Sequence, residues 1–575
     1  MVSRLFTCRL APTLAALFLG LWAPAASAAP STSRTPPTGR SNGPGSTSLH
    51  RLSSASATTN SETPVPVVAS DLPPAGRRLS ANQVLAIADR LSKMRAVRRE
   101  YPGSYGGAYL KGPLRWQVSY FSRGGKKEIG QVIIDDATGR VLEQWTGFQV
   151  AWTMARGYPG AFGRHVNALY IWIPLCLLFV APFIRWRKPF SLLHLDLLVL
   201  LSFSVSLAFF NNADIYASVP LTYPPLVYLL IRMLAACGIA KRRSRTGAET
   251  DPQQTDDKPS AQSSPAPHSA RLRLSPYRPP ERSTLHGSIP MSWMAVGVVF
   301  LLGFRIGLNV TDSNVIDVGY AGVIGAQKIV KGGALYGHWP SDNEHGDTYG
   351  PVNYEVYVPF EQALGFTGHW DDLPAAHGAA IAFDLLAVLL LFLIGLQIRG
   401  PTLGVGLAYA WVAYPFTLFG LESNSNDTLV AVLVLAGILA ASRPAIRGGF
   451  AALAGLAKFA PLAIAPLLFT HGVSELPVRR RARALASSLF AFVLVAGIVS
   501  IPALSGNSLH TIYERTVAYQ ANRGSPFSVW GLYGGLDGPQ EAVQIAAVIL
   551  ILLLAFLPRR ADVIGLAGAC AAVMI

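Results

Sequence analysis

The sequence predicts a mainly α-helical, polytopic membrane protein, with about 10–11 membrane segments and a small extracytoplasmic α+β domain near its N-terminus. Of the 575 residues, 51% are hydrophobic and only 14% are charged, whereas soluble proteins carry roughly 25% charged residues. Apolar runs of about 18–22 residues recur, the length that crosses a hydrocarbon core of roughly 30 Å. The net charge of +16 is explained by arginines at the ends of these runs, which set the orientation of the spans in the membrane. A basic interaction tail is the alternative, and no nucleic-acid partner is needed.

Residues 1–28 have the pattern of a secretory signal peptide. Arg4 and Arg9 precede a short apolar core, and Ala26–Ala28 forms a small-residue cleavage site. An uncleaved anchor is the alternative, and both interpretations export the residues that follow. Residues 29–78 are rich in Ser, Thr, Pro and Gly, which predicts a disordered linker.

Residues 79–150 predict the small α+β domain. A helical pattern begins at Ser80, and alternating apolar residues from Leu114 to Tyr120 predict a strand. Two further strands, Glu128–Ile134 and Arg140–Gln144, follow across a turn. This pattern, with the stretch DDATGRVLEQW, resembles the PepSY domain. The resemblance implies a regulatory or binding module, and a simple extracytoplasmic interaction module is the alternative.

The membrane part divides into two units. Residues 168–240 predict three transmembrane helices, and the Pro/Ser/Gln-rich residues 241–288 predict a disordered cytoplasmic linker. Residues 289–575 form the second unit, whose larger loops lie on the extracytoplasmic side because basic residues mark the other side. The last apolar run reaches Ile575, so we expect this unit to continue beyond it.

One apolar run, Gly448–Thr470, has basic residues at both ends, which an ordinary crossing would not have. Gly455, Lys458, Pro461 and Pro466 interrupt it, so we expect two half-helices that enter the membrane and return to the same side. Broken backbone at this depth is tolerated only where it is buried or lines a cavity. The lysine is therefore a functional candidate, and a lysine that extends from a tilted helix to the surface is the alternative.

The segment Thr311–Leu373 is an acidic and aromatic exception in a basic protein. It contains nine carboxylates, two lysines and no arginine. An acidic, aromatic loop at a membrane surface suits a polar, hydroxyl-rich ligand.

Within this segment, VIDVGYAGVIGAQKIVKGGALYG resembles the first outer loop of GT-C membrane glycosyltransferases, in particular the family 87 group. The stretches TYGPVNYEVYVPFE, GLAKFAPLAIAPLL and RGSPFSVWGLYG follow in the order of that family's later motifs. The resemblance covers roughly residues 290–575. It implies a plasma-membrane enzyme that moves a hexose, such as mannose, from a polyprenyl-phosphate carrier. The acceptor would be an extracytoplasmic glycan or glycolipid.

The resemblance gives Asp317 the position of the catalytic aspartate. A carboxylate there would take the proton of the attacking acceptor hydroxyl, a contribution of about 10²–10⁴-fold. Asp312 is the nearest substitute. A carboxylate that only caps the following helix is the alternative for Asp317.

The candidate substrate-binding residues are Tyr320, Tyr336, Glu422, Asp427, Lys458 and Arg523. The lysine and the arginine suit the departing phosphate, the tyrosines suit the apolar faces of a sugar, and the carboxylates suit its hydroxyls. Anchoring of helix ends, lining of the membrane interface and ordinary loop chemistry are the respective alternatives.

No cofactor is firmly implied. The run SDNEHGD at residues 341–347 offers ligands for a hard divalent cation, and a solvated acidic loop is the alternative. A transporter or lipid flippase would use ionisable residues in or near spans, such as Asp196, Asp384 and Lys458, but the sequence shows no internal repeat. A non-catalytic sensor that acts through its N-terminal domain is a third interpretation.

Overall fold

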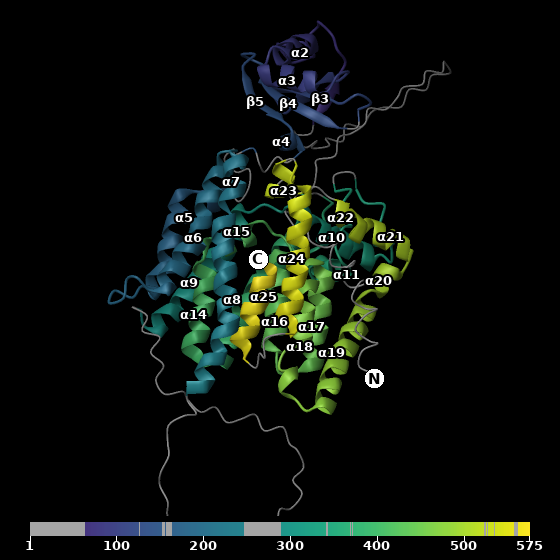
Figure 1. Ribbon diagram of the computed structural model, residues 1–575. Coiled ribbons are helices and arrows are strands. Elements are labelled where there is room, and N and C mark those ends of the chain that lie inside the picture. Colours follow the sequence, from purple (N-terminus) through teal and green to yellow (C-terminus); the bar gives the residue numbers. More distant parts are fainter. Residues whose placement is uncertain are drawn as a thin grey trace, which may run out of the picture.

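A computed structural model of the chain describes residues 64–125, 127–151, 156, 164–246, 289–340, 343–368, 370, 372–522, 525, 527–533, 535–556 and 562–575. The predicted signal peptide and most of both predicted linkers lie outside these residues. Figure 1 shows a small domain of strands and helices above a larger helical bundle.

The N-terminal domain is a five-stranded antiparallel sheet whose strands follow chain order. The strands are β1 (Val65–Val67), β2 (Tyr105–Lys111), β3 (Arg115–Phe121), β4 (Glu128–Asp135) and β5 (Val141–Thr146). Helices α2 (Ala81–Asp89) and α3 (Ser92–Glu100) share a core with β3 and β4. The predicted helix and three strands are confirmed. β1 lies in the stretch expected to be a disordered linker, and pairing with β2 orders it.

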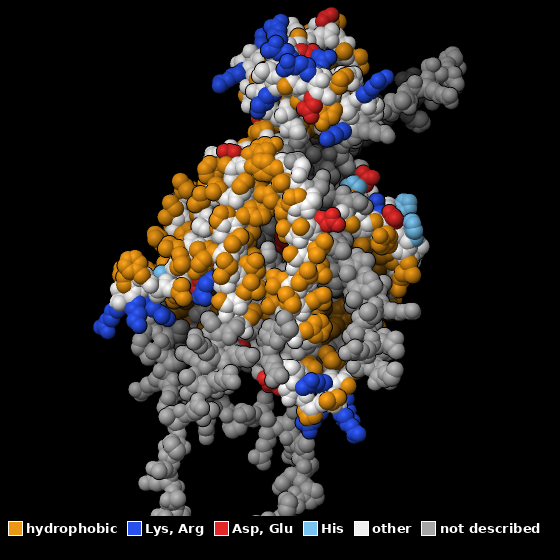
Figure 2. Space-filling model, in the orientation of Figure 1, with side chains coloured by type: hydrophobic (Ala, Val, Ile, Leu, Met, Phe, Trp, Pro, Cys, Tyr) orange, Lys and Arg blue, Asp and Glu red, His pale blue; other side chains and the backbone are white. Residues whose placement is uncertain are grey.

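The bundle is made of helices that begin and end close to the predicted spans. They are α5 (Leu169–Val180), α6 (Leu192–Asn211), α7 (Ile215–Leu221), α8 (Tyr223–Thr246), α9 (Met291–Asp312), α13 (Pro374–Arg399), α14 (Pro401–Ala413), α15 (Pro415–Glu422), α16 (Asp427–Leu439), α17 (Pro444–Ala457), α18 (Ala465–Thr470), α19 (Val478–Val499), α24 (Asp537–Phe556) and α25 (Val563–Met574). Hydrophobic side chains cover its flanks, and Lys and Arg gather toward the end far from the N-terminal domain (Figure 2).

In the described part of the chain, six helices are long and apolar enough to cross a membrane, or seven if the bent pair α14–α15 counts as one. This number is lower than the ten or eleven segments expected. The remaining predicted segments are present, but Leu169–Phe183, Asp427–Leu439 and Val563–Met574 are short, and α17–α18 is broken. The fold is that of a polytopic helical membrane protein.

A buried arginine stabilises the 59° bend between α14 and α15. Arg305 of α9 donates from Nη2 and Nε to the two carboxylate oxygens of Asp384, at 2.6 and 3.0 Å. It also donates to the backbone carbonyls of Val412 (3.4 Å) and Thr417 (3.1 Å), one on each side of the bend. Carbonyls freed by a helix break in an apolar interior need such donors. The sequence analysis did not identify this arginine.

The predicted break at Lys458 is confirmed. Helix α17 ends at Ala457, and a 3-10 helix, η4 (Ala460–Ile464), leads into α18. Arg447, near the start of α17, donates to the carbonyls of Phe469 (3.3 Å) and His471 (2.8 Å) at the end of α18. The two ends of this hairpin therefore lie together, and Lys458 is at its tip.

A layer of short helices lies on the side of the bundle nearer the N-terminal domain (Figure 1). It contains α10 (Asp317–Val330), α11 (Pro351–Glu355), α12 (Val358–Leu364), α20 (Ile501–Leu504), α21 (Leu509–Tyr513), a π-helix (Glu514–Ala518), α22 (Tyr519–Asn522) and α23 (Val529–Leu532). Two glycines of α10 lie against tyrosine rings. A Cβ on Gly322 would lie 2.6 Å from the Tyr357 ring, and one on Gly325 would lie 2.2 Å from the Tyr354 ring. The acidic segment is thus a packed layer.

Candidate functional site

The site is built where the α9–α10 connection meets the loop between α15 and α16. The backbone amides of Asn314 and Ile316 donate to the carbonyls of Glu422 and Ser423, both at 3.1 Å. These two bonds tie together segments that are about a hundred residues apart in the chain. They place Asp317, the first residue of α10, beside the 422–427 loop.

Asn424 holds this junction together from inside the loop. It is buried and has a positive φ of 47°, a conformation that asparagine tolerates better than most residues. Its Nδ2 donates to Ser313 Oγ (2.7 Å) and to the Asn314 carbonyl (2.9 Å). Its Oδ1 accepts from Asn309 Nδ2 at 2.9 Å. A Cβ on Gly319 would lie 2.1 Å from the Asn424 carbonyl oxygen, so α10 touches the loop directly.

Two predicted site residues form an ion pair at this junction. Lys458 Nζ donates to Asp427 Oδ1, although the residues are 31 positions apart. Ser425 Oγ donates to the other carboxylate oxygen at 2.8 Å, and the ammonium lies 5.8 Å from the centre of the Tyr349 ring. The Lys458 side chain is 9% exposed and that of Asp427 is 53% exposed. The carboxylate is therefore the part of the pair that a ligand can reach.

Buried polar atoms without partners lie next to this ion pair. Asn426 Nδ2 donates to Asn353 Oδ1 at 2.5 Å. The Tyr357 hydroxyl, Asn353 Nδ2 and Asn426 Oδ1 have no hydrogen-bond partner among the described residues. Burial, and then the charge of Asp427, raises the pKa of Tyr357, so its hydroxyl stays protonated and can donate. Such orphan groups are uncommon in folded proteins, and here they make the interior of the site polar.

Asn353 and Tyr357 are not among the site residues predicted from the sequence. Both lie in the stretch TYGPVNYEVYVPFE, which resembles a family motif. The resemblance of that stretch to the motif was the sequence feature that could have identified them. Its polar residues, however, are of the same types as those of an ordinary loop.

Glu422 is a buried carboxylate at the same junction. Its side chain is 1% exposed, and neither carboxylate oxygen has a hydrogen-bond partner among the described residues. An ionised carboxylate buried without partners is costly. A proton or a bound group would be needed to offset that cost. Its backbone carbonyl, rather than its side chain, supports the junction with α9.

Three other predicted residues are used in packing. Asp312 accepts hydrogen bonds at Oδ2 from the His165 backbone amide (3.1 Å) and lies 2.5 Å from His165 Nδ1, which ties α9 to the short helix η2 (Arg164–Asn167). Tyr320 is buried and its ring lies 4.8 Å from that of Trp370. Tyr336 is also buried, and its hydroxyl donates to the Tyr349 carbonyl at 3.0 Å. Arg523 lies outside the described residues.

The segment that follows α20 packs against the acidic segment. Asn507 exchanges hydrogen bonds with the backbone of Tyr336, at 3.1 and 2.9 Å. Arg515 Nε donates to the buried carboxylate of Asp347 at 2.6 Å, which also accepts from the Gly337 amide at 2.7 Å. Among the described residues, no group of three His, Cys, Asp or Glu side chains is arranged to hold a metal ion. Asp342, part of the acidic run, lies outside them.

Glu355 of α11 is a further residue that the sequence analysis did not identify as a candidate. Burial raises its pKa to about 7, and its Oε1 has no hydrogen-bond partner among the described residues. A carboxyl group with a pKa near neutrality is able to take or give a proton.

Residues 348–575 match the family described as Glycosyltransferase family 87. The match supports a membrane glycosyltransferase. It contains the Asp427–Lys458 pair, covers less than half of the chain, and begins after Asp317. No curated protein and no solved structure matches the chain. The N-terminal domain lies outside the match, so its resemblance to PepSY stays a prediction.

The residues that a transporter would use are engaged in ion pairs. Asp196 accepts two hydrogen bonds from Arg232, at 2.7 and 2.8 Å. Asp384 pairs with Arg305, and Lys458 pairs with Asp427. Binding of a transported ion at any of them would require an existing pair to break.

Proposed function

We propose that this protein moves a hexose, such as mannose, from a polyprenyl-phosphate carrier to a hydroxyl group of an extracytoplasmic glycan or glycolipid, at the plasma membrane. One observation carries the proposal. The first turn of α10, the 422–427 loop and the tip of the α17–α18 hairpin converge on one polar site, and most of that site lies within the region that matches a glycosyltransferase family.

Asp317 is the proposed general base. In the reaction, the acceptor oxygen forms a bond to the anomeric carbon while the bond from that carbon to the phosphate oxygen breaks. The bonding electrons leave with the polyprenyl phosphate, and the acceptor proton passes to the Asp317 carboxylate. Asp317 is half-buried beside the junction, and a positioned base contributes about 10²–10⁴-fold.

Asp427 is the proposed partner of the sugar hydroxyls, because its carboxylate is exposed and a few such polar groups fix a ligand's orientation. The amide of Asn353 and the protonated hydroxyl of Tyr357 are fully buried, so we propose that they form the polar floor beneath Asp427 and make no direct contact with the sugar. Lys458 is mostly covered, so we propose that it orients Asp427 and adds positive charge close to the departing phosphate. Arg523 is the second proposed phosphate contact, and Glu422 is a proposed sugar contact.

The test offers the purified protein a panel of labelled polyprenyl-phosphate sugars with glycan and glycolipid acceptors. We expect one hexose donor to be consumed, and Asp317→Asn to lower the transfer rate at least 100-fold, within the range for a lost general base. Glu344→Gln is the matched control, because Glu344 is an exposed carboxylate of the same segment.

Asp312→Asn separates the two predicted aspartates. If it abolishes transfer while Asp317→Asn does not, the base is Asp312. If no donor is consumed with any acceptor, the proposed function is wrong.

A further inference from the structure

An apolar pocket of about 520 Å³ lies at the seam between the helices that precede residues 247–288 and those that follow them. Its walls come from both sides, with Phe179 and Leu197 from α5 and α6, and Met294 and Leu407 from α9 and α14. These helix ends lie far from the N-terminal domain (Figure 1). The volume is within the roughly 300–1,000 Å³ typical of small-molecule pockets.

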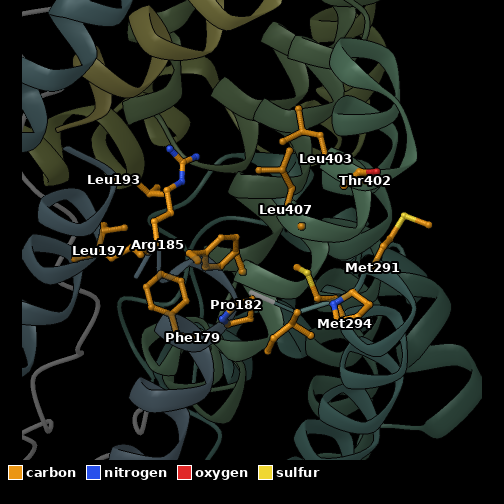
Figure 3. A pocket seen from close by; sticks show the side chains of 16 residues that line it. Phe179, Pro182, Arg185, Leu193, Leu197, Met291, Met294, Thr402, Leu403 and Leu407 are labelled. Atoms are coloured by element: carbon orange, nitrogen blue, oxygen red, sulfur yellow. The ribbon is translucent and has the colours of Figure 1, made fainter. Parts of the chain in front are cut away.

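Arg185 is the single charged residue among the sixteen that line this pocket. Figure 3 shows its side chain rising between the leucines of α6, Leu193 and Leu197, and those of α14, Leu403 and Leu407. Among the described residues, no hydrogen bond or ion pair involves its guanidinium group. Arg185 is exposed, so its charge is open to an anion that lies at this end of the pocket.

The loop that carries Arg185 is held in place by His194. The Arg185 backbone amide donates to His194 Nε2 at 2.9 Å. The neutral ring therefore carries its proton on Nδ1, which donates to the Pro189 carbonyl at 2.6 Å. This double hydrogen bond fixes the turn from α5 to α6, and with it the position of the arginine.

The same loop has the composition of the lipid headgroup zone. Trp186 is 79% exposed and Phe190 is completely exposed, and Arg187 and Lys188 stand between them. Exposed aromatic rings beside basic residues are typical of segments at the membrane–water interface. This composition favours a location of the loop, and of Arg185 with it, at the level of phosphate headgroups.

We propose that this pocket binds an anionic phospholipid, with one acyl chain among the apolar side chains and its phosphate on Arg185. Basic pockets between membrane helices bind anionic headgroups, and here the lipid would join the helices α5 and α6 to α9 and α14. The proposal is independent of the proposed reaction, since no residue of the candidate site lines the pocket.

The test uses the full chain in detergent and measures retained lipid by native mass spectrometry. We expect dioleoylphosphatidylglycerol to stay bound and dioleoylphosphatidylcholine to be lost. Arg185→Gln should weaken phosphatidylglycerol binding about fivefold, because one basic residue near the surface contributes about 1 kcal/mol. Arg187→Gln makes the same charge change two residues away, outside the lining, and should weaken binding clearly less than Arg185→Gln. Millimolar inorganic phosphate should not displace the lipid.

A second variant tests the apolar part with the charge intact. A Cβ on Gly406 meets only Met294, at 4.0 Å, so Gly406→Leu fits the backbone and fills the pocket. We expect Gly406→Leu to abolish lipid retention. This variant tests the proposal even if Arg185→Gln does not fold. Equal losses in Arg185→Gln and Arg187→Gln, equal binding of the two lipids, displacement by inorganic phosphate alone, or full retention in Gly406→Leu would each overturn the proposal.

Discussion

The contact between α10 and the 422–427 loop can be tested by a single methyl group. In Gly319→Ala, the new Cβ would lie 2.1 Å from the Asn424 carbonyl oxygen. Real Cβ contacts are essentially never below 3.0 Å, so α10 and the loop must separate by about 1 Å. This displacement moves Asp317 away from the groups around Asp427. A misplacement of this size costs on the order of 10²-fold in rate.

The same substitution also has a measurable effect on stability. Overpacking costs about 1–3 kcal/mol, which exceeds the roughly 0.5–1 kcal/mol that alanine gains over glycine in a helix. Gly307→Ala in α9 is the matched control, because nothing lies within 4 Å of its Cβ position. We expect Gly319→Ala to lower both the melting temperature in detergent and the transfer rate, and Gly307→Ala to lower neither. Wild-type transfer by Gly319→Ala would refute the placement of Asp317 beside this loop.

Two further predictions concern buried charges. Arg305→Met leaves Asp384 without its partner, and we expect a loss of about 3–5 kcal/mol in unfolding free energy, seen as a lower melting temperature. Arg305→Met/Asp384→Leu should recover only part of it, because the carbonyls of Val412 and Thr417 still lack their donor, and a neutral single variant would show that the pair does not stabilise the bend. Glu355 has a raised pKa of about 7 against a usual 4.5, so its stabilising effect is complete below pH 4.5 and is lost as the pH rises through 7. Glu355→Gln should remove this pH dependence, roughly 1–2 kcal/mol once screening by solvent at this partly exposed group is included, from melting curves between pH 5 and 8, and unchanged curves would contradict it.

The membrane helices were largely predictable because their signal is local. One of the three transmembrane helices predicted within residues 168–240 is α6 (Leu192–Asn211), and the predicted break at Lys458 is present. Proline disfavours the continuation of a helix through it, and Pro461 follows shortly after the end of α17. The pattern of residues within one segment was enough to identify these features.

Elements stabilised mainly by their neighbours were not predictable. β1 is a three-residue strand that contains a proline, and β2 contains the Gly106–Gly107 pair, so neither has the composition of a strand. α3 is highly charged and buries only Met94 and Val97. Each is ordered by its contacts with the rest of the domain.

The candidate site was only partly predictable for a related reason. Residue type indicated Asp427 and Lys458 as candidates, but their pairing across 31 positions depends on the hairpin. Residue type could not separate Tyr320 and Tyr336, whose rings are buried in packing, from Tyr357, whose hydroxyl lacks a partner. Whether a particular tyrosine side chain is buried depends on the folded chain. Residue type alone indicates only how deeply tyrosines are buried on average.

The α17–α18 hairpin also constrains how the protein is assembled. Its tip lies against earlier parts of the chain, since a Cβ on Gly350 would lie 2.0 Å from the Leu456 carbonyl oxygen. Its base lies against a later part, since a Cβ on Gly448 would lie 2.2 Å from the Ser488 carbonyl oxygen. During synthesis the tip can therefore pack before the base does, because the partners of the tip are made before the hairpin and α19 is made after it. The contacts that surround the hairpin are complete only once α19 is in place.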